Sequence, residues 1–491
     1  MAMVDDAEPA LDIERHLRYW KMCLDRPLPH HYLSNEGNRM ALAYFIINSI
    51  CILTQTPGGE VAPQVKPLIP PEDRRKLREW ILSHQQPGGG FAATSSLVFP
   101  LRGYEHWEPE TGAQDMELPG AANLPATLFA LQLLALLADE GDEAGAFNGV
   151  DRVQILRWLR RLQREDGSFG EVLRQLPGHG WFIGGGYDMR YCYIAASIRW
   201  MLRGDVREGQ SGWVEDFDAR ALADYILRSQ TYDGGFAGSS QEEPHAGYAY
   251  CAIAALSLLD RPIENSTASH SSNILHSGIR DMPGLIHWLT SRQFAYLDPD
   301  SDLAQLDDQH DDDGDDDDDD YDLDEAVNFL LPKRLADLSL SQNLRHVACN
   351  GRCNKVADTC YSWWVSGSLA NLGRTDLIDW RPARRFLLDK MAHRIGGFSK
   401  HPGGPPDVYH GCFGLTALAV MGEPGLSELD SALVVPVHTV RVIEKARAAL
   451  VGRAMEEGRA GKLTREAVEM GLAMRGETPA WLVAVGGYFG S

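Results

Sequence analysis

The sequence predicts an all-α fold, an α/α toroid in which six helical hairpins form a barrel. Two observations lead to this prediction. Amphipathic segments alternate along the chain with almost wholly apolar ones, and a short motif recurs at the end of the amphipathic segments. An amphipathic helix needs one buried face, whereas an apolar helix needs burial all round. The apolar helices should therefore lie inside the amphipathic ones, and six such hairpins close a ring.

The recurring motif is an aromatic residue followed five positions later by a glutamine. It occurs four times, as Trp80 and Gln85, Trp158 and Gln163, Tyr225 and Gln230, and Trp288 and Gln293. In the first three copies a Gly-rich turn leads to a phenylalanine, and a degenerate copy ends at Gly397 and Phe398. Because glycine punctuates helical segments, the motif marks the turn of each hairpin.

The expected helices follow in order along the chain. The first hairpin pairs an amphipathic helix over 12–25 with an apolar helix over 38–53. The later apolar helices are expected at 121–137, 188–202, 248–259, 358–372 and 409–421. Beyond residue 424 the chain becomes rich in Ala, Glu and Arg, which predicts a peripheral helix near 439–457.

An acidic insert interrupts the predicted barrel. We divide the chain into barrel residues 10–295, an insert at 296–345, barrel residues 346–425 with the candidate zinc site, and a C-terminal extension at 426–491. Nine of the ten residues in 311–320 are Asp. Self-repulsion and the lack of apolar residues predict disorder there. Consecutive aspartates also lack the spaced ligands of a calcium-binding loop.

Composition argues against several classes of protein. The formal net charge is −23, but seventeen Asp or Glu residues and no Lys or Arg lie within 298–325, which leaves about −6 for the rest of the chain. That balance gives no indication of nucleic-acid binding. The apolar runs are too short to span a membrane, so an integral membrane protein is not expected. Eight cysteines without paired spacing and an N-terminus without a signal pattern predict a cytoplasmic protein.

One stretch, residues 350–364, combines two cations, a carboxylate, two thiols and three aromatic residues. In a helix interior, residues two apart point to nearly opposite faces, so Asp358 and Cys360 could share a target only at a helix start. Aspartate is also a good N-cap residue. With a histidine from elsewhere, this pair could hold a zinc ion. The alternative is a capped helix with a buried free cysteine.

The starts of the other apolar helices are also polar, and in an α/α barrel they converge on one rim. These starts are 188–190, 243–247, 352–360 and 400–410. Below them, Tyr193, Tyr250, Trp363, Trp364 and Phe413 could line an apolar cavity, although core packing explains such residues equally well. A cationic rim above an apolar cavity suits a substrate with a diphosphate head and a hydrocarbon tail.

These motifs resemble those of the β subunits of protein prenyltransferases. The resemblance rests on residues 188–190, 232–235, 351–355, 358–364, 396–400 and 409–411, in this order. It extends from about residue 15 to about residue 425 and is greatest to the type I geranylgeranyltransferases. It implies a toroid that pairs with a helical α subunit as an obligate heterodimer.

The resemblance also implies a mechanism. Asp358, Cys360 and His410 would bind one Zn²⁺ and leave an open position for the cysteine of a protein that ends in a CaaX sequence. The expected protein substrates are small GTPases. The cysteine thiolate would displace diphosphate from the first carbon of geranylgeranyl diphosphate and form a thioether.

Further contacts are implied by resemblance. The diphosphate would lie among His245, Arg352, Lys355 and Tyr361, and the isoprenoid beside Arg190, Tyr193, Trp364 and Ala41. The residues alone leave alternatives open: Arg352 and Lys355 as solvated surface charges, His245 as a capping residue, and Arg190 as the partner of Asp188. The chain also has Ala246 where the family usually has glycine.

Two positions bear on the prenyl donor. Lys400 occupies the position at which farnesyltransferases carry an aspartate that helps to hold Mg²⁺, so the resemblance implies that Mg²⁺ is not required. Ala41 aligns with a tryptophan that closes the floor of the farnesyltransferase tunnel, so a longer chain should fit. By contrast, Tyr409 and residues 352–355 resemble farnesyltransferases more, and a strict preference for leucine at the end of CaaX is not expected.

Alternative functions remain for this sequence. The first is a farnesyltransferase β subunit, and a Rab-type prenyltransferase is disfavoured by Lys400. A terpenoid cyclase shares the α/α barrel, but its Asp-x-Asp-Asp motif matches here only within the acidic insert. A barrel that binds lipid or protein without catalysis is a further alternative, and bound zinc would distinguish it.

Overall fold

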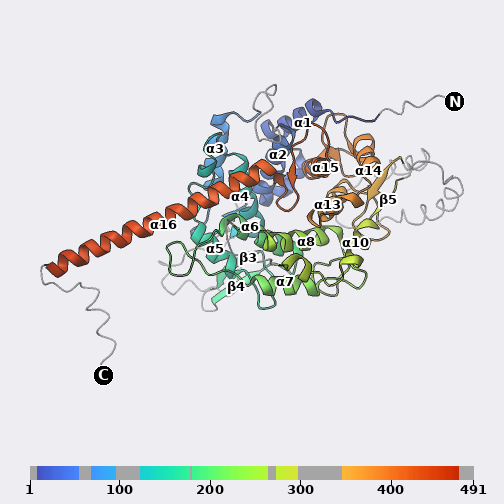
Figure 1. Cartoon of the computed structure of the whole chain (residues 1–491). Coiled ribbons are helices and arrows are strands. Elements are labelled where there is room, and N and C mark those ends of the chain that lie inside the picture. The colour runs from blue at the N-terminus through green and yellow to red at the C-terminus, as the bar shows by residue number, and fades with distance from the viewer. Residues whose placement is uncertain are drawn as a thin grey trace, which may run out of the picture.

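A computed structural model describes residues 8–54, 68–94, 122–176, 180–263, 273–296 and 345–474 of the 491 residues. The acidic insert, for which the sequence predicts disorder, lies almost wholly outside the described residues, as does the C-terminal end beyond residue 474. The described chain is helical with a few short strands (Figure 1), so the prediction of an all-α fold is confirmed.

Six inner helices form a closed ring in the described part of the chain. They are α2 (Arg39–Thr54), α4 (Leu124–Leu136), α6 (Met189–Leu202), α8 (Ala246–Asp260), α13 (Thr359–Asn371) and α15 (Val408–Val420). Each of these helices contacts the next, and α15 contacts α2. Apolar side chains cover nearly every face of these helices and are buried, as expected for an inner ring.

An outer helix precedes each inner one in the chain. The outer helices are α1 (Ile13–Asp25), α3 (Pro71–Leu82), α5 (Arg152–Arg161), α7 (Ala219–Arg228), α10 (Met282–Thr290) and α14 (Trp380–Phe386), the last continued by a π-helical turn, η5 (Leu387–Met391). Shorter helices in the connections are η1 (His30–Asn38), η3 (Glu143–Gly145), α9 (Ile274–Ser277) and η4 (Thr375–Leu377).

The recurring glutamine joins each hairpin to the next one. The Gln163 side chain donates to the carbonyl of Asp218 and accepts from its N–H, both at 2.8 Å, and Asp218 is the N-cap of α7. Gln85, Gln230 and Gln293 bond the chain before α5, α10 and α14 in the same way. The repeat in the sequence therefore fixes the spacing of the outer helices.

The turn glycines allow the next outer helix to approach closely. Gly167 has a φ of +93°, and a Cβ there would collide with the Ala221 carbonyl of α7. Gly396, in the degenerate last copy, would collide in the same way with the Arg15 carbonyl of α1. Because α1 is the first outer helix, this close approach of a turn glycine joins the last hairpin to the first and closes the ring.

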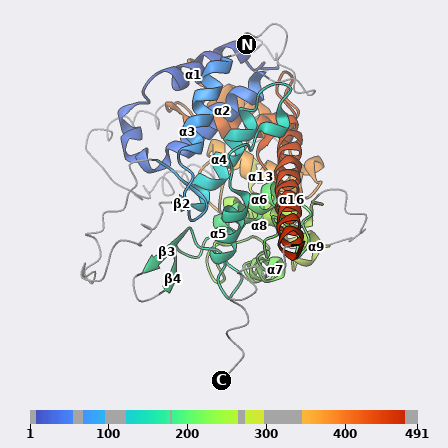
Figure 2. The same cartoon turned by 90° about the vertical axis from the view of Figure 1, so that its left-hand side faces the viewer.

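Short antiparallel strands join the helices. β1 (Phe91–Ala92), β2 (Ala122–Asn123), β3 (Val172–Leu176) and β4 (Gly180–Gly184) form one sheet in that order, and Figure 2 shows β3 and β4 at the edge of the molecule. β5 (Gln293–Ala295) pairs with β6 (Val347–Cys349), with Ala295 opposite Val347. The chain therefore leaves the ring for the insert and returns to it at adjacent positions.

Two further strand pairs flank α15. β7 (Phe398–Ser399) pairs with β8 (Pro406–Asp407) just before the helix, and β9 (Leu429–Asp430) pairs with β10 (Val435–Pro436) after it. The turn between β9 and β10, residues 431–434, accepts hydrogen bonds at its carbonyls from five inner helices. The donors are Tyr44, Gln132, Tyr193, Tyr250 and Asn371. Asn371 is the last residue of α13, whereas Tyr44, Tyr193 and Tyr250 lie in the first two turns of their helices, so this turn binds side chains from different levels of the ring.

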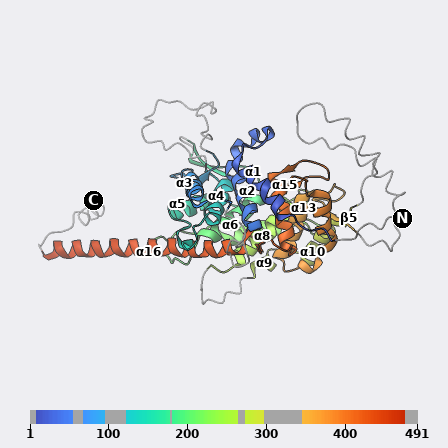
Figure 3. The ribbon, with the colours of Figure 1, turned by 90° about the horizontal axis from the view of Figure 1, so that it is seen from above.

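The C-terminal helix α16 (Val437–Met474) starts near the predicted position but is about twice as long. Its first turns pack on the ring through Ile443 and Ala446, and the buried Arg447 donates to the carbonyl of Trp200 at 2.6 Å. The rest of the helix extends beyond the barrel (Figure 3). None of the described helices is long and apolar enough to cross a membrane.

Candidate metal centre and active site

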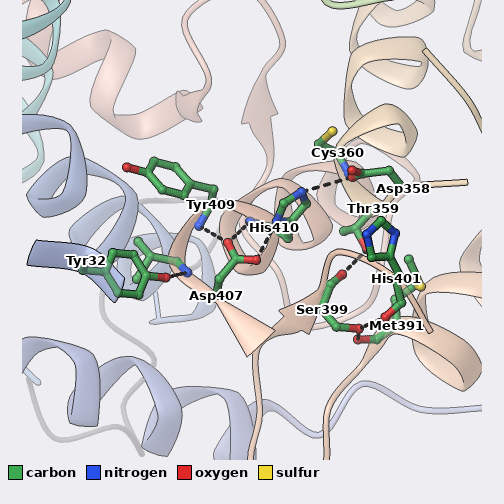
Figure 4. A network of polar contacts seen from close by, with 11 residues as sticks. Tyr32, Asp358, Thr359, Cys360, Met391, Ser399, His401, Asp407, Tyr409 and His410 are labelled. Atoms are coloured by element: carbon green, nitrogen blue, oxygen red, sulfur yellow. Dashed lines mark hydrogen bonds and ion pairs between the residues drawn. The ribbon is translucent and has the colours of Figure 1, made fainter. Parts of the chain in front are cut away.

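Asp358, Cys360 and His410 come together at the starts of α13 and α15 (Figure 4). Asp358 is the N-cap of α13, and its Oδ1 accepts the N–H of Cys360 at 2.7 Å. His410 Nε2 lies 3.1 Å from the same Asp358 oxygen. One ligand atom from each of the three residues lies within 4.8 Å of the other two. A carboxylate, a thiol and an imidazole this close form a donor set that fits a zinc ion.

His410 is oriented by a carboxylate that our sequence reasoning did not single out. Asp407 is the N-cap of α15 and accepts from the N–H groups of Tyr409 and His410 at 2.8 and 2.9 Å. Its Oδ2 lies 2.6 Å from His410 Nδ1. Nδ1 is thus occupied, and Nε2 is left to face Asp358 and Cys360. The signal was an aspartate at the predicted start of an apolar helix, three residues before the histidine.

The charges at this cluster favour a cation. Burial lowers the pKa of His410, but the hydrogen bonds and charges of Asp358 and Asp407 outweigh it and raise this pKa to about 9. Burial, and then the Asp358 carboxylate, raises the pKa of the Cys360 thiol. Without a metal, a proton is therefore held between His410 and Asp358, and the thiol is neutral. A divalent cation could replace both protons.

His245 and Tyr361 form the next part of the rim. His245 caps α8, and its Nδ1 accepts the N–H of Gly247 at 3.0 Å. Its Nε2 therefore carries the proton and faces the Tyr361 hydroxyl at 3.2 Å. Burial, and then the charge of Arg352, lowers the pKa of His245 to about 4, so the ring is neutral. The neutral His245 ring therefore has one hydrogen-bond donor, the Nε2–H group.

The glycine-to-alanine difference at Ala246 is accommodated. Ala246 is fully buried at the start of α8, and its N–H donates to the carbonyl of Gly351 at 2.9 Å. Gly351 itself has no room for a side chain, because a Cβ would collide with the Tyr361 ring. The loop before α13 and the start of α8 therefore pack together without requiring glycine at 246.

Two cationic side chains of the rim, Arg190 and Arg352, have acidic partners. Arg352 donates to Glu243 at 2.8 Å, and Arg190 donates from Nε and Nη2 to both carboxylate oxygens of Asp188, the alternative that the sequence left open. Both cations nevertheless act on His245, since each lowers its pKa. Lys355 is half-buried in the same loop as Arg352, where its carbonyl accepts from Asn350 at 3.1 Å.

Lys400 lies next to the start of α13. It is exposed and follows β7, and its carbonyl accepts the N–H of Thr359 at 3.2 Å. Its charge acts on the Cys360 thiol, where it opposes the increase in pKa caused by burial. The Lys400 charge is therefore felt at the Cys360 thiol.

Aromatic rings form a continuous series around the inside of the ring. The centroid distances are 5.1 Å for Tyr250 and Trp364, 4.7 Å for Trp364 and Phe413, 5.5 Å for Phe413 and Phe45, and 5.8 Å for Phe45 and Phe129. Trp364 and Phe413 are half-buried, whereas Trp363 is fully buried and is part of the core.

Tyr193 is also buried, and its hydroxyl donates to the carbonyl of Ala432 at 2.8 Å. Ala41 is half-buried near the start of α2.

Comparison with known proteins places this chain in a family. Residues 11–435 match the prenyltransferase alpha-alpha toroid domain. The chain belongs to the protein prenyltransferase β subunits. It is 30% identical to the geranylgeranyl transferase type-1 subunit beta of Arabidopsis thaliana, over 86% of this chain and 88% of that protein. It is 26% identical to the protein farnesyltransferase subunit beta of Pyricularia oryzae, over 84% of this chain and 63% of that protein.

The fold of this prenyltransferase β subunit is also found among solved structures. Candida albicans protein geranylgeranyltransferase-I, solved in complex with GGPP, superposes with a TM-score of 0.63 at 23% identity. The match covers 89% of this chain and 99% of that one. The prediction of an α/α toroid is thereby confirmed.

Proposed function

We propose that this chain is the catalytic β subunit of a protein geranylgeranyltransferase type I. It would transfer the geranylgeranyl group from its diphosphate to the cysteine of C-terminal CaaX sequences. The observation that carries the proposal is the Asp358, Cys360 and His410 cluster, which lies on a cationic rim above an aromatic-lined ring. The similarity to the Arabidopsis type 1 subunit along most of both chains supports the choice of prenyl group.

Asp358, Cys360 and His410 would hold one Zn²⁺, with Asp407 fixing the His410 ring. When bound, Zn²⁺ would supply the charge that keeps the substrate cysteine as a thiolate near neutral pH. The thiolate sulfur forms a bond to the first carbon of the prenyl chain, and the bond from that carbon to the diphosphate oxygen breaks.

The rim residues would stabilise the leaving diphosphate as its negative charge grows. The Nε2–H of His245 donates a hydrogen bond to the Tyr361 hydroxyl oxygen, and the phenol O–H would then be free to donate to a diphosphate oxygen. Arg352, Lys355 and Lys400 add positive charge. Because Lys400 brings an ammonium to this place, Mg²⁺ is not needed in the proposal. Arg190, Trp364, Tyr193 and Ala41 would contact the isoprenoid or shape its tunnel.

Farnesyl transfer is the second candidate, and specific observations favour it. The Pyricularia farnesyltransferase subunit is also a relative, and Tyr409, which resembles the farnesyltransferases, precedes the proposed ligand His410 and donates its hydroxyl to Asn35 at 3.2 Å. In either case we propose an obligate heterodimer with an α subunit, small GTPases with CaaX ends as substrates, and a cytoplasmic location.

Competition between the two prenyl donors tests this proposal. The chain is co-expressed with its cognate α subunit, and equal concentrations of geranylgeranyl and farnesyl diphosphate compete for CaaX peptides that end in Leu or Met. The proposal predicts a predominantly geranylgeranylated product. Predominant farnesylation would favour the second candidate, and no transfer by a zinc-loaded heterodimer would contradict both.

A further inference from the structure

We propose that Thr359 is a positioning residue whose buried hydroxyl holds Lys400 against the metal centre. In this proposal, the independence of the reaction from Mg²⁺ depends on the Thr359 hydroxyl. The inference rests on the proposed function, because Lys400 acts there on the leaving diphosphate. It concerns a residue between two of the proposed metal ligands, Asp358 and Cys360, that is not itself a ligand.

Two hydrogen bonds join Thr359 to the segment that carries Lys400. The Thr359 Oγ1 donates to the carbonyl of Ser399 at 2.7 Å, and its backbone N–H donates to the carbonyl of Lys400 at 3.2 Å. Thr359 is fully buried, so water cannot replace its hydroxyl at the Ser399 carbonyl. The first residue of α13 thus binds two successive peptide groups of the Lys400 segment.

The Thr359 hydroxyl is not needed to start the helix. Asp358 is the N-cap of α13, and its carboxylate accepts the N–H of Cys360. The Thr359 side chain is directed away from its own helix, to β7. A threonine required only for capping would bond within its own first turn. The geometry therefore indicates a connection between two elements.

The other end of the Lys400 turn is anchored as well. β7 pairs with β8, with Ser399 opposite Pro406 and Phe398 opposite Asp407, the residue that orients His410. Within the turn, the Ser399 hydroxyl donates to the carbonyl of His401 at 2.7 Å. The backbone of Lys400 is therefore held between the two elements that carry the proposed zinc ligands.

The position of the ammonium depends on this backbone anchor. In the part of the chain that the structure describes, no ion pair holds the Lys400 side chain, which is exposed. A lysine side chain is flexible, so its effective concentration at the diphosphate falls when its backbone moves. Release of Ser399 and Lys400 from Thr359 would place the charge less accurately, and a metal cation bound to the diphosphate could then compensate.

The test compares Mg²⁺ dependence among variants of the zinc-loaded heterodimer with geranylgeranyl diphosphate and a CaaX peptide. Thr359→Val removes the hydroxyl and keeps the side-chain shape, whereas Thr359→Ser keeps the hydroxyl. Thr416→Val is a matched control, because Thr416 is a buried threonine of α15 whose hydroxyl donates within its own helix, to the Phe413 carbonyl at 2.9 Å. Thr359→Ala removes the same donor and is used if the valine variant does not assemble.

We expect Thr359→Val to reduce kcat about tenfold without Mg²⁺, the effect of losing one net hydrogen bond to a buried carbonyl, and millimolar Mg²⁺ to restore it. The wild type, Thr359→Ser and Thr416→Val should not respond to Mg²⁺. Zinc content is measured for each variant, so that loss of the metal is recognised directly. A loss of activity in Thr359→Val that Mg²⁺ does not restore, at full zinc content, would overturn the inference.

A double variant shows whether Thr359 acts through Lys400. Lys400→Ala should itself require Mg²⁺, and adding Thr359→Val to it should change kcat little further. If the two effects multiply, Thr359 does not act through Lys400 and the inference fails. If the wild type transfers the prenyl group only with Mg²⁺, the role of Lys400 in the proposed function fails. If the wild type does not need Mg²⁺ and Thr359→Val has unchanged kinetics, only the inference about Thr359 fails.

Discussion

Asp407 Oδ2 lies 2.6 Å from Nδ1 of His410 and thereby directs the opposite nitrogen, Nε2, to Asp358. The same Asp407 side chain caps α15. The start of an inner helix and the orientation of a proposed zinc ligand therefore depend on one carboxylate. The fold and the site cannot be separated at this residue.

Replacement of Asp407 by asparagine should weaken zinc binding while preserving the helix start. Asparagine is as good an N-cap as aspartate, but it removes the charge that holds the His410 ring. We expect zinc affinity to fall by about 10- to 100-fold. Competition with a chelator measures this affinity, and helical content by circular dichroism serves as the control. Unchanged affinity would show that Asp407 only caps α15.

Zinc binding should release protons. In the metal-free protein, His410 has a pKa raised to about 9, and burial raises the pKa of the Cys360 thiol, so both groups are protonated at pH 7.5. Because the metal must displace these protons, about two should leave per zinc, and apparent affinity should rise with pH, less steeply above about 9, where His410 has already lost its proton and the thiol has not. Calorimetry in buffers of different ionisation enthalpy counts them. Release of no proton would contradict this account of the cluster.

Enlarging the side chain at Ala41 should change the choice of prenyl donor. If Ala41 borders the far end of the isoprenoid, Ala41→Trp should shift the ratio of kcat/KM toward farnesyl diphosphate, and Ala41→Val should have a smaller effect in the same direction. Steric exclusion of one isoprene unit is worth on the order of tenfold or more. An equal loss with both donors would mean that the tunnel floor lies elsewhere.

Removal of the acidic insert should leave the barrel intact. The β5–β6 pair holds Ala295 opposite Val347, and the backbone N–H of Tyr296 donates to the carbonyl of His346 at 3.0 Å, so the two ends of the insert are adjacent. We expect a short Gly-Ser loop in place of residues 298–344 to preserve Tm and kcat/KM, because closing a shorter loop costs little free energy. Loss of transfer with an unchanged Tm would reveal a role of the insert in catalysis.

The sequence predicts the helices of the barrel well because each hairpin carries its own signals. Gln163 and Gly167, which belong to the recurring motif, both contact the start of the next outer helix. The spacing of Asp358 and Cys360 indicates a helix start that could hold a metal, but the third proposed ligand, His410, could be named only from the resemblance to the prenyltransferase β subunits. The contacts at Thr359 and Asp407 depend on which strands pair, so no local pattern shows them.

Other features have little local signal. The turn at 431–434 gains its place from hydrogen bonds with helices distant in sequence, such as Tyr44 to the carbonyl of Val434 at 2.6 Å. Trp363 and Trp364 are neighbours of the same type, and only the rotation of α13 decides that the first is in the core and the second faces inward. The helix α16 continues past the predicted end at 457 through Gly458 and Gly461, although glycine reduces helix propensity.

Bound zinc in the purified heterodimer tests the central claim most directly. Elemental analysis should give about one zinc per β chain for the wild type, and much less after Cys360→Ala or His410→Ala, because each removes one of three ligands. The buried Cys412→Ala variant, which leaves the cluster intact, should keep the metal. A wild type without zinc, or a Cys360→Ala variant with its full content, would contradict the account.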